Sequence, residues 1–291
     1  MWIVFSLGSA FFAALTGVLA KIGIRHTDSN LATAVRTGVV LVFSWLIILI
    51  TGEARELLNP SGYASSLVWI ILSGFCTGGS WLCYFKAIQL GDVNKVAPID
   101  KSSVLITILA GFLLFGDPVS WSKAAGIALL TAGLAFAVMP EKKGEQPTEK
   151  GKLGWLFFAA LSAVFAALSS ILAKPGMEHL SSNTATALRT IIVLIMSWAV
   201  VFATGSKKGA LREIPKRDML FIILSGAATG ASWLCYFRAV RDGQLSTVAV
   251  IDKLSLPLTV VLSVLVLKEK PTKRSAAAAA FMTLGALAML I

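Results

Sequence analysis

Nearly uninterrupted apolar runs, each about as long as a bilayer is thick, dominate the sequence. Residues 67–85 and 247–267 are two of them, and roughly 20 apolar residues suffice for a helix to cross the hydrocarbon core of a membrane. Charged residues make up only 14% of the 291-residue chain, against about 25% in soluble domains. So few charges cannot cover the surface of a water-soluble protein of this length. We therefore predict an all-α integral membrane protein and exclude the soluble enzyme classes.

The net charge of +11 does not indicate a nucleic-acid-binding protein. The basic residues lie in short connections between apolar runs, and they form neither a basic stripe nor a recognition motif. We expect the lipid bilayer as a partner and no nucleic acid. Cys76, Cys83 and Cys235 lie inside apolar runs without metal-ligand spacing, so they are expected to be small buried side chains. No disulfide, metal site or cofactor is predicted.

Turn-forming and charged residues divide the chain into ten candidate transmembrane helices, whose ends are accurate to a few residues. They are residues 2–23, 30–50, 66–90, 95–115, 120–139, 153–173, 183–204, 218–240, 246–267 and 273–291. The longest hydrophilic stretch, 141–152, is rich in Lys, Glu, Gly and Pro. It is the expected linker between one five-helix unit over residues 1–140 and a second over residues 153–291. No stretch is long enough for a soluble catalytic domain.

The two units are copies of each other. Residues 73–88 (SGFCTGGSWLCYFKAI) and 225–240 (SGAATGASWLCYFRAV) share 11 identities in 16 positions at an offset of 152. The segments 99–101 and 251–253 both read Ile-Asp-Lys at the same offset. Further upstream the offset is 153, which aligns Arg36 with Arg189 and Ser44-Trp45 with Ser197-Trp198. Chance does not produce such a match, so we infer an internal duplication.

An odd number of helices per copy makes the two copies enter the membrane from opposite sides. This arrangement is an inverted-topology repeat, on which many secondary transporters are built. Lys and Arg are concentrated in the loops after the odd-numbered helices; residues 207–217, for example, hold five of them, whereas the matching stretch 53–56 holds only Arg55. By the positive-inside rule the odd loops should be cytoplasmic, and both termini should lie outside.

The repeated Trp-Leu-Cys-Tyr-Phe-(Lys/Arg)-Ala segments, each followed by an Asp-Lys segment, resemble the EamA family of the drug/metabolite transporter superfamily. The resemblance covers nearly the whole chain. It implies a ten-helix secondary carrier of the bacterial inner membrane, and it favours an exporter of amino acids, metabolites or toxic compounds. The second copy departs from the pattern, with Val250 where the first has Pro98 and with Pro257 inside the ninth helix. This departure bears on local helix geometry and does not weaken the family resemblance.

Ionisable residues inside the apolar runs are the first candidates for function, because charges at such depth usually line a cavity or pair with one another. Adjacent residues on a helix do not face each other, so we expect that the aspartate and lysine of each Asp-Lys pair cannot bind each other. Each aspartate should instead pair with a group on another helix, such as the arginine of its cluster. The two symmetric clusters would then be gates near opposite membrane faces; a purely structural ion pair is the alternative. The first cluster is Arg36, Asp100 and Lys101, and the second is Arg189, Asp252 and Lys253.

Aromatic residues near the middle of two helices are the second group of candidates. Trp81 and Trp233 lie about nine residues from the helix ends, whereas belt tryptophans belong at the interface. Together with Tyr84 and Tyr236, one turn further on, they are predicted to line a solute cavity, with plain helix packing as the alternative. The Ser, Thr and Gly residues at 73–80 and 225–232 are spaced as faces for close helix packing.

The predicted function is secondary transport by alternating access. The sequence contains no GxxxxGK[ST] motif for ATP and no constellation typical of an intramembrane enzyme. The deep charges leave a surplus of +2, from four basic and two acidic residues, which a small anionic or zwitterionic, amino acid-like solute would offset. A flippase for a lipid-linked carrier and a passive channel are the alternatives. A monomer suffices for this function, and a homodimer is compatible with it.

Overall fold

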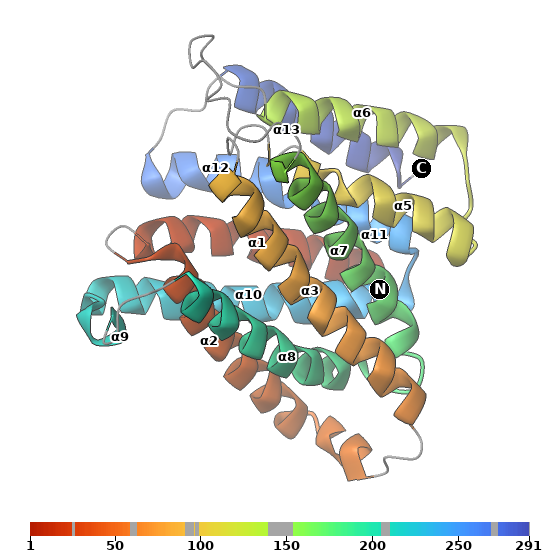
Figure 1. The fold of residues 1–291 in the computed structure, drawn as a ribbon. Coiled ribbons are helices and arrows are strands. Elements are labelled where there is room, and N and C mark those ends of the chain that lie inside the picture. Colours follow the sequence, from red (N-terminus) through yellow and green to blue (C-terminus); the bar gives the residue numbers. More distant parts are fainter. Residues whose placement is uncertain are drawn as a thin grey trace.

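The structure is a computed structural model, which describes residues 1–24, 27–58, 63–90, 96, 99–138, 154–204, 210–268 and 273–290. Every regular element in these ranges is a helix (Figure 1). In the first copy the helices are α1 (Trp2–Gly23), α2 (Ser29–Ile50), the short 3₁₀-helix η1 (Glu53–Leu58), α3 (Ala64–Leu90), α5 (Ser103–Leu114) and α6 (Trp121–Val138). In the second copy they are α7 (Gly154–Gly176), α8 (Ser182–Ala203), α9 (Ala210–Glu213), α10 (Lys216–Asp242), α11 (Leu245–Asp252), α12 (Ser255–Leu267) and α13 (Lys273–Ala288).

Most of these helices begin and end within a few residues of the predicted positions. Among the described residues, seven helical segments are long and apolar enough to cross a membrane: α1, α2, α3, α7, α8, α10 and the segment Leu245–Leu267. Shorter apolar helices cover Trp121–Phe136 and Ala276–Ala288. The all-helical fold is therefore confirmed, while the number of ten crossings stays a prediction. The predicted linker, 141–152, lies outside the described residues.

The predicted ninth helix is interrupted in its middle. Lys253 and Leu254 follow α11 with backbone hydrogen bonds to Val250 and Ile251, three residues back, which is the pattern of a 3₁₀ turn. Pro257 explains the break, because a proline ring clashes with the carbonyl four residues earlier, here that of Lys253. The first copy also has a turn at the equivalent place, where the Ser102 N–H bonds to the Ile99 carbonyl. Each Asp-Lys pair therefore lies at a break between helical segments.

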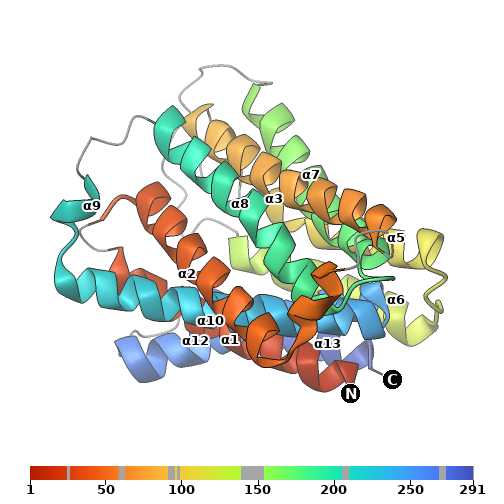
Figure 2. The same ribbon diagram turned by 90° about the horizontal axis from the view of Figure 1, so that it is seen from below.

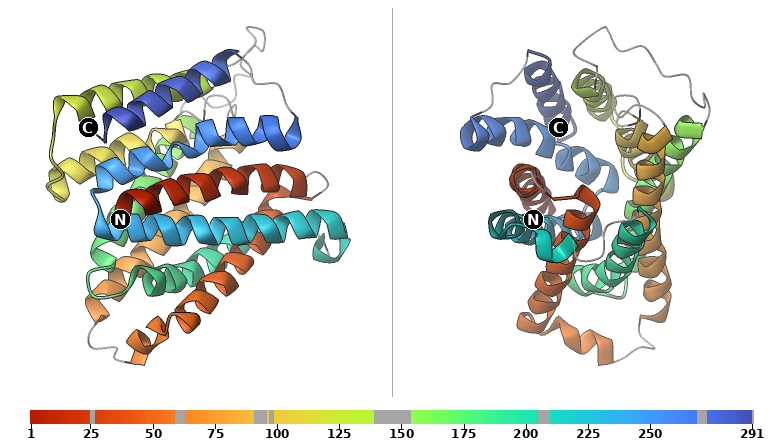
Figure 3. Two further views of the ribbon diagram at one scale, coloured as in Figure 1. Left: turned by 180° about the vertical axis from the view of Figure 1, so that it is seen from behind. Right: turned by 60° about the vertical axis from the view of Figure 1, so that its left-hand side comes forward.

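The two copies pack against each other in a crossed pattern (Figures 1 and 2). The first helix of each copy packs on the third helix of the other copy, giving the pairs α1–α10 and α3–α7. The pairs α2–α10 and α3–α8 are equivalent in the same way, as are α1–α12 and α5–α7. The helices α2 and α8 contact each other, and so do α6 and α13. Both termini lie at the same end of the bundle (Figure 3).

Two glycines allow the close approach of helices at equivalent places. A Cβ atom built on Gly74 of α3 would lie 2.8 Å from the Cβ of Ile192 on α8, and one built on Gly226 of α10 would lie 2.6 Å from the Cβ of Val39 on α2. Real side-chain atoms do not approach this closely, so glycine is required at both positions. This close-packing role agrees with the prediction made from the small residues of both segments.

Candidate functional site

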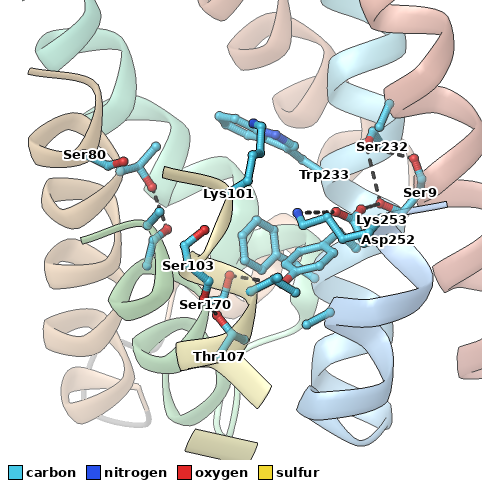
Figure 4. Close-up of a pocket in the computed structure, with 18 of the residues that line it drawn as sticks. Ser9, Ser80, Lys101, Ser103, Thr107, Ser170, Ser232, Trp233, Asp252 and Lys253 are labelled. Carbon is cyan, nitrogen blue, oxygen red and sulfur yellow. Dashed lines mark hydrogen bonds and ion pairs between the residues drawn. The ribbon is translucent and has the colours of Figure 1, made fainter. Parts of the chain in front are cut away.

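A cavity of 430 Å³ lies between the two copies, and helices of both contribute to its walls (Figure 4). Ser103 and Thr107 of α5 line one side, while Asp252 and Lys253 line the opposite side. Hydroxyl groups are its most frequent polar feature. The hydroxyl-bearing residues of the lining are Ser9, Thr77, Ser80, Ser103, Thr107, Ser169, Ser170, Ser232 and Tyr236.

Hydroxyl pairs between the first and third helices lead to the two aspartates. On one side the Ser9 hydroxyl donates to Asp252 Oδ1 at 2.9 Å and lies 3.3 Å from the Ser232 hydroxyl. On the other side the Ser162 hydroxyl donates to Asp100 Oδ1 at 2.8 Å and lies 3.2 Å from the Ser80 hydroxyl. The residues on the two sides occupy equivalent positions in the two copies, so the two sets of hydrogen bonds are equivalent as well. Each aspartate is thus held by the first helix of the opposite copy.

The lysine partners of the two aspartates correct a prediction made from the sequence. Lys101 Nζ lies 3.7 Å from Asp100 Oδ2, and Lys253 Nζ lies 3.5 Å from Asp252 Oδ2, so neighbouring residues pair with each other. The expectation that they cannot was wrong. It assumed a continuous helix, whereas the chain turns at each Asp-Lys pair and the long lysine side chain reaches back to the carboxylate.

Arg189 is also placed differently from the expectation of an Arg–Asp ion pair. Its side chain is 4% exposed, and its Nε donates to the Ser73 hydroxyl at 3.0 Å. One terminal nitrogen, Nη2, donates to the hydroxyls of Thr77 at 2.5 Å and Ser169 at 2.8 Å. The other, Nη1, is buried without a hydrogen-bond partner. Hydroxyl groups therefore replace the expected carboxylate, because the crossed packing brings α3 against α8, and α7, which carries Ser169, packs on the same α3.

Aromatic rings complete the setting of Arg189. Its guanidinium carbon lies 5.1 Å from the ring centroid of Trp233 and 4.4 Å from that of Phe237, within the range of cation–π attraction. Tyr236 lies beside Phe237 and donates from its hydroxyl to the Ser170 hydroxyl at 3.0 Å. The central cation is thus covered by the aromatic wall of the cavity.

Arg36, the counterpart of Arg189, lies elsewhere. It is partly buried and lines a small cavity of 20 Å³ together with Ser225 and Ile222 of α10. Among the described residues it makes no ion pair or hydrogen bond through its side chain. The predicted pairing of Arg36 with Asp100 is therefore wrong for the structure as it stands.

The predicted aromatic residues divide into two groups. Trp81, Trp233 and Tyr236 line the central cavity. Tyr84 does not; it packs in a separate cluster with Ala87 and Ala159. Of the predicted charged residues, the cavity gathers Lys101, Arg189, Asp252 and Lys253, while Arg36 and Asp100 are outside its lining.

Sequence reasoning missed the hydroxyl groups that hold Arg189 and the aspartates. Ser73, Thr77 and Ser80 recur at spacings of four and three residues on α3, and their equivalents recur on α10. This spacing was interpreted as a packing face alone. Hydroxyls on such a face next to a buried arginine are the signal that would have identified them.

The described residues form helices only, several of them of membrane length, with a polar cavity between the two copies, and this is the architecture of a multi-pass membrane protein. The EamA-like transporter family matches residues 1–139 and 153–291. The chain belongs to this family, which confirms the resemblance predicted from the repeated segments. Each of the two matches covers one copy. The family indicates a transporter rather than an enzyme.

Two further comparisons agree with this assignment. A protein from a Sinorhizobium species, described as "Uncharacterized transporter in cobO 3'region", is 44% identical over 137 residues, which are 47% of this chain and 96% of that protein. That relative is therefore about one copy long. A solved structure described only as "Crystal structure of protein" matches with a TM-score of 0.78 and 18% identity, covering 97% of this chain and 94% of that chain. At this identity the likeness shows the fold alone.

Proposed function

We propose that the protein is a secondary transporter that moves a small amino acid-like solute, zwitterionic or anionic, across the bacterial inner membrane by alternating access, and that it exports this solute. The observation that carries the proposal is the composition of the central cavity. It combines cationic groups, many hydroxyls and aromatic walls in a space of 430 Å³, which lies within the usual range for small-molecule sites.

The charges of the cavity favour a solute with a negative group. Lys101, Arg189 and Lys253 line it, and among the described residues Asp252 is the single carboxylate in the lining. Adding Asp100, the partner of Lys101, still leaves one positive charge in excess. An uncompensated charge inside a membrane is costly, so a carboxylate-bearing solute would stabilise the occupied site. Lys101, whose side chain is 46% exposed, is the most accessible cation.

The aromatic residues favour a solute that also has an apolar part. Trp81, Trp233 and Tyr236 line the same space as the charges. Aromatic side chains offer large apolar contact surfaces, with a polar group on Tyr and Trp. An amino acid with an apolar side chain matches this combination, with its carboxylate near the lysines and its side chain against the rings.

The duplication supports alternating access. The contacts α1–α10 and α3–α7 are equivalent, and each carries a matching hydroxyl–aspartate bond. Each half of the molecule therefore has the same set of interactions as the other half. In inverted-repeat transporters one half rocks against the other around a fixed site. We assign the pairs Asp100–Lys101 and Asp252–Lys253 to the two closures, each at a helix break.

The test has two stages. Metabolite profiles of the medium, from cells with and without overexpression, would identify the exported solute. The purified protein in liposomes should then transport that solute and lose transport when its carboxylate is converted to a methyl ester. Exclusive transport of permanent cations would contradict the proposal. Leak currents would indicate a passive channel, and transport of lipid-linked sugars would indicate a flippase.

The orientation has its own test. We expect the loop around Lys208 to be cytoplasmic, so that a cysteine introduced there reacts with a membrane-impermeant maleimide only after the cells are opened. Rapid labelling in intact cells would reverse the orientation. Position 208 lies outside the described residues, so the prediction rests on the distribution of positive charge alone.

A further inference from the structure

Arg36 and Arg189 have the same backbone setting. A Cβ atom built on Gly226 would lie 3.0 Å from the Arg36 carbonyl oxygen, and one built on Gly74 would lie 3.3 Å from the Arg189 carbonyl oxygen. Each arginine therefore starts from a helix pressed against the glycine of the opposite copy. The difference between the two sites lies in the side chains.

The hydroxyl groups that hold Arg189 have counterparts around the equivalent site in the other copy. Ser73, Thr77 and Ser169 correspond to Ser225, Thr229 and Thr16. In the first set the Ser73 hydroxyl donates to the Ser169 carbonyl at 2.5 Å, and in the second the Ser225 hydroxyl donates to the Thr16 carbonyl at 3.1 Å.

The hydroxyls of the two sets are also paired in the same way. Those of Thr77 and Ser169 lie 2.6 Å apart, and those of Thr229 and Thr16 lie 3.3 Å apart. The second set is therefore assembled in the same geometry, with wider spacing.

Only the first set holds a guanidinium group. Arg36 lies beside Ser225 in their shared small cavity, yet no hydrogen bond joins its side chain to the three hydroxyls among the described residues. The Thr16 hydroxyl donates to the Phe12 carbonyl of its own helix at 2.9 Å, and its oxygen can still accept a bond from a guanidinium group, as Thr77 does while donating to the Ser73 carbonyl. Threonine hydroxyls commonly form such bonds along a helix.

We propose that Thr16, Ser225 and Thr229 form a second guanidinium-binding site, which Arg36 occupies when the transporter faces the opposite side of the membrane, while Arg189 leaves its own site. The proposal rests on alternating access and deepens it. In an inverted repeat the two halves exchange conformations when access reverses, so the hydrogen-bonded arginine and the released arginine exchange roles.

The exchange connects conformation to the solute cavity. In the present state the guanidinium of Arg189 lies against Trp233 and Phe237, which line the cavity together with Thr77 and Ser169. Release of Arg189 would remove the cation from beneath this aromatic wall. The arginines are therefore positioning residues. They select the state in which a guanidinium group lies against the aromatic wall of the cavity.

Thr77→Val and Thr229→Val test the exchange, because valine keeps the shape of threonine and removes the hydroxyl. In a background with the three cysteines replaced by alanine, Ala13→Cys or Ala166→Cys would report access to the cavity, since both positions line it. Labelling by an impermeant maleimide would be compared in right-side-out and inside-out vesicles. Thr77→Ser and Thr229→Ser, which keep the hydroxyl, are the matched controls.

We expect the two valine variants to shift the labelling ratio in opposite directions. A hydrogen bond to a charged group changes a two-state equilibrium roughly tenfold to a hundredfold, and a shift of that order should disappear in the serine controls. Should a valine variant fail to fold, Arg36→Gln and Arg189→Gln form a second pair with the same expected opposition. Shifts in the same direction, or no shift for Thr229→Val and Arg36→Gln, would overturn the exchange.

This experiment can fail independently of the proposed solute. Opposite shifts combined with transport of permanent cations would keep the exchange and refute the carboxylate assignment. Transport of the carboxylate solute without opposite shifts would refute the exchange alone.

Discussion

Arg189 and Arg36 occupy equivalent positions in two copies of one structural unit, yet their guanidinium groups are bound differently. Arg189 donates to three hydroxyls and lies against two aromatic rings. Arg36 lies beside Ser225, the counterpart of Ser73, and within the described part of the chain no hydrogen bond joins its side chain to any of the three counterpart hydroxyls. Because the local residues are so similar, we attribute the difference to the conformation of the whole molecule, as proposed above. A duplicated transporter can therefore be asymmetric because equivalent residues form different contacts in its two copies, even where the residues themselves are nearly the same.

The largest expected effect comes from deleting the two arginine side chains in turn. Arg189→Ala should lower the free energy of unfolding by about 3 kcal/mol, because a buried residue loses several charge-assisted hydrogen bonds. Arg36→Ala should lower it by less than about 1 kcal/mol, as for most mutations that break no such network. Thermal unfolding in detergent measures both. Equal losses would mean that Arg36 is bound as firmly as Arg189.

The two aspartates should differ in their effect on solute binding. Asp252 lines the cavity and Asp100 does not, although both bind a lysine and a serine. For a zwitterionic solute, Asp252→Asn should raise KM about tenfold, because the carboxylate would lose its charge-assisted bond to the ammonium group of the solute, worth roughly 1.5 kcal/mol or more. Asp100→Asn should change KM much less. A larger effect at Asp100 would assign solute binding to the other aspartate.

A finer test of the difference between the two arginine sites exchanges the hydroxyl residues Thr16 of α1 and Ser169 of α7. Thr16→Ser should make its site more like that of Ser169, and Ser169→Thr should do the reverse. Each change keeps the hydroxyl and only adds or removes a methyl group, so it is expected to move the balance of states by at most about 1 kcal/mol, less than the removal of a bond to a charged group. Labelling of Ala166→Cys from both sides of the membrane would measure it. Shifts in one common direction would show that the residue at this position does not select the state.

The smallest effect concerns the ring above the guanidinium. Trp233→Leu removes a ring 5.1 Å from Arg189, while Trp81→Leu removes a tryptophan for which no cation–π contact is found among the described residues. The first change should cost about 0.5–1 kcal/mol more than the second. A double-mutant cycle with Arg189→Met isolates this coupling. Zero coupling would reduce the contact to simple packing.

The sequence was sufficient for the elements whose signals are local. The apolar runs and turn residues predicted α1 and α2 nearly to the residue. The break after α11 was not predicted as a break, although Pro257 was recognised as a departure. A proline is tolerated in the first turn of a helix but not in its interior. Pro257 lies in the first turn of α12, which begins at Ser255, and the sequence alone did not show that a new helix begins there.

The site could be predicted only in part, because its contacts cross between the copies. The buried arginine was identified by the cost of placing a charge in an apolar segment, and the central tryptophans by their distance from the interface where belt tryptophans lie. The partners of Arg189 were not, because Ser73 and Ser169 lie 96 residues apart and no local pattern connects them. Tyr84 shows the converse error: it is the equivalent of Tyr236 by sequence, yet it packs outside the cavity.

The crossed pairing of the first and third helices has a consequence for biosynthesis. Because α3 packs on α7 and α1 packs on α10, the first copy leaves the ribosome before the helices that cover its small, hydroxyl-bearing faces have been made. Those faces must wait in the lipid, or be held by an insertion factor, until the second half arrives. Nascent chains arrested between the copies should therefore be the most sensitive to proteolysis, and assembly should depend on the late helices more than on the early ones.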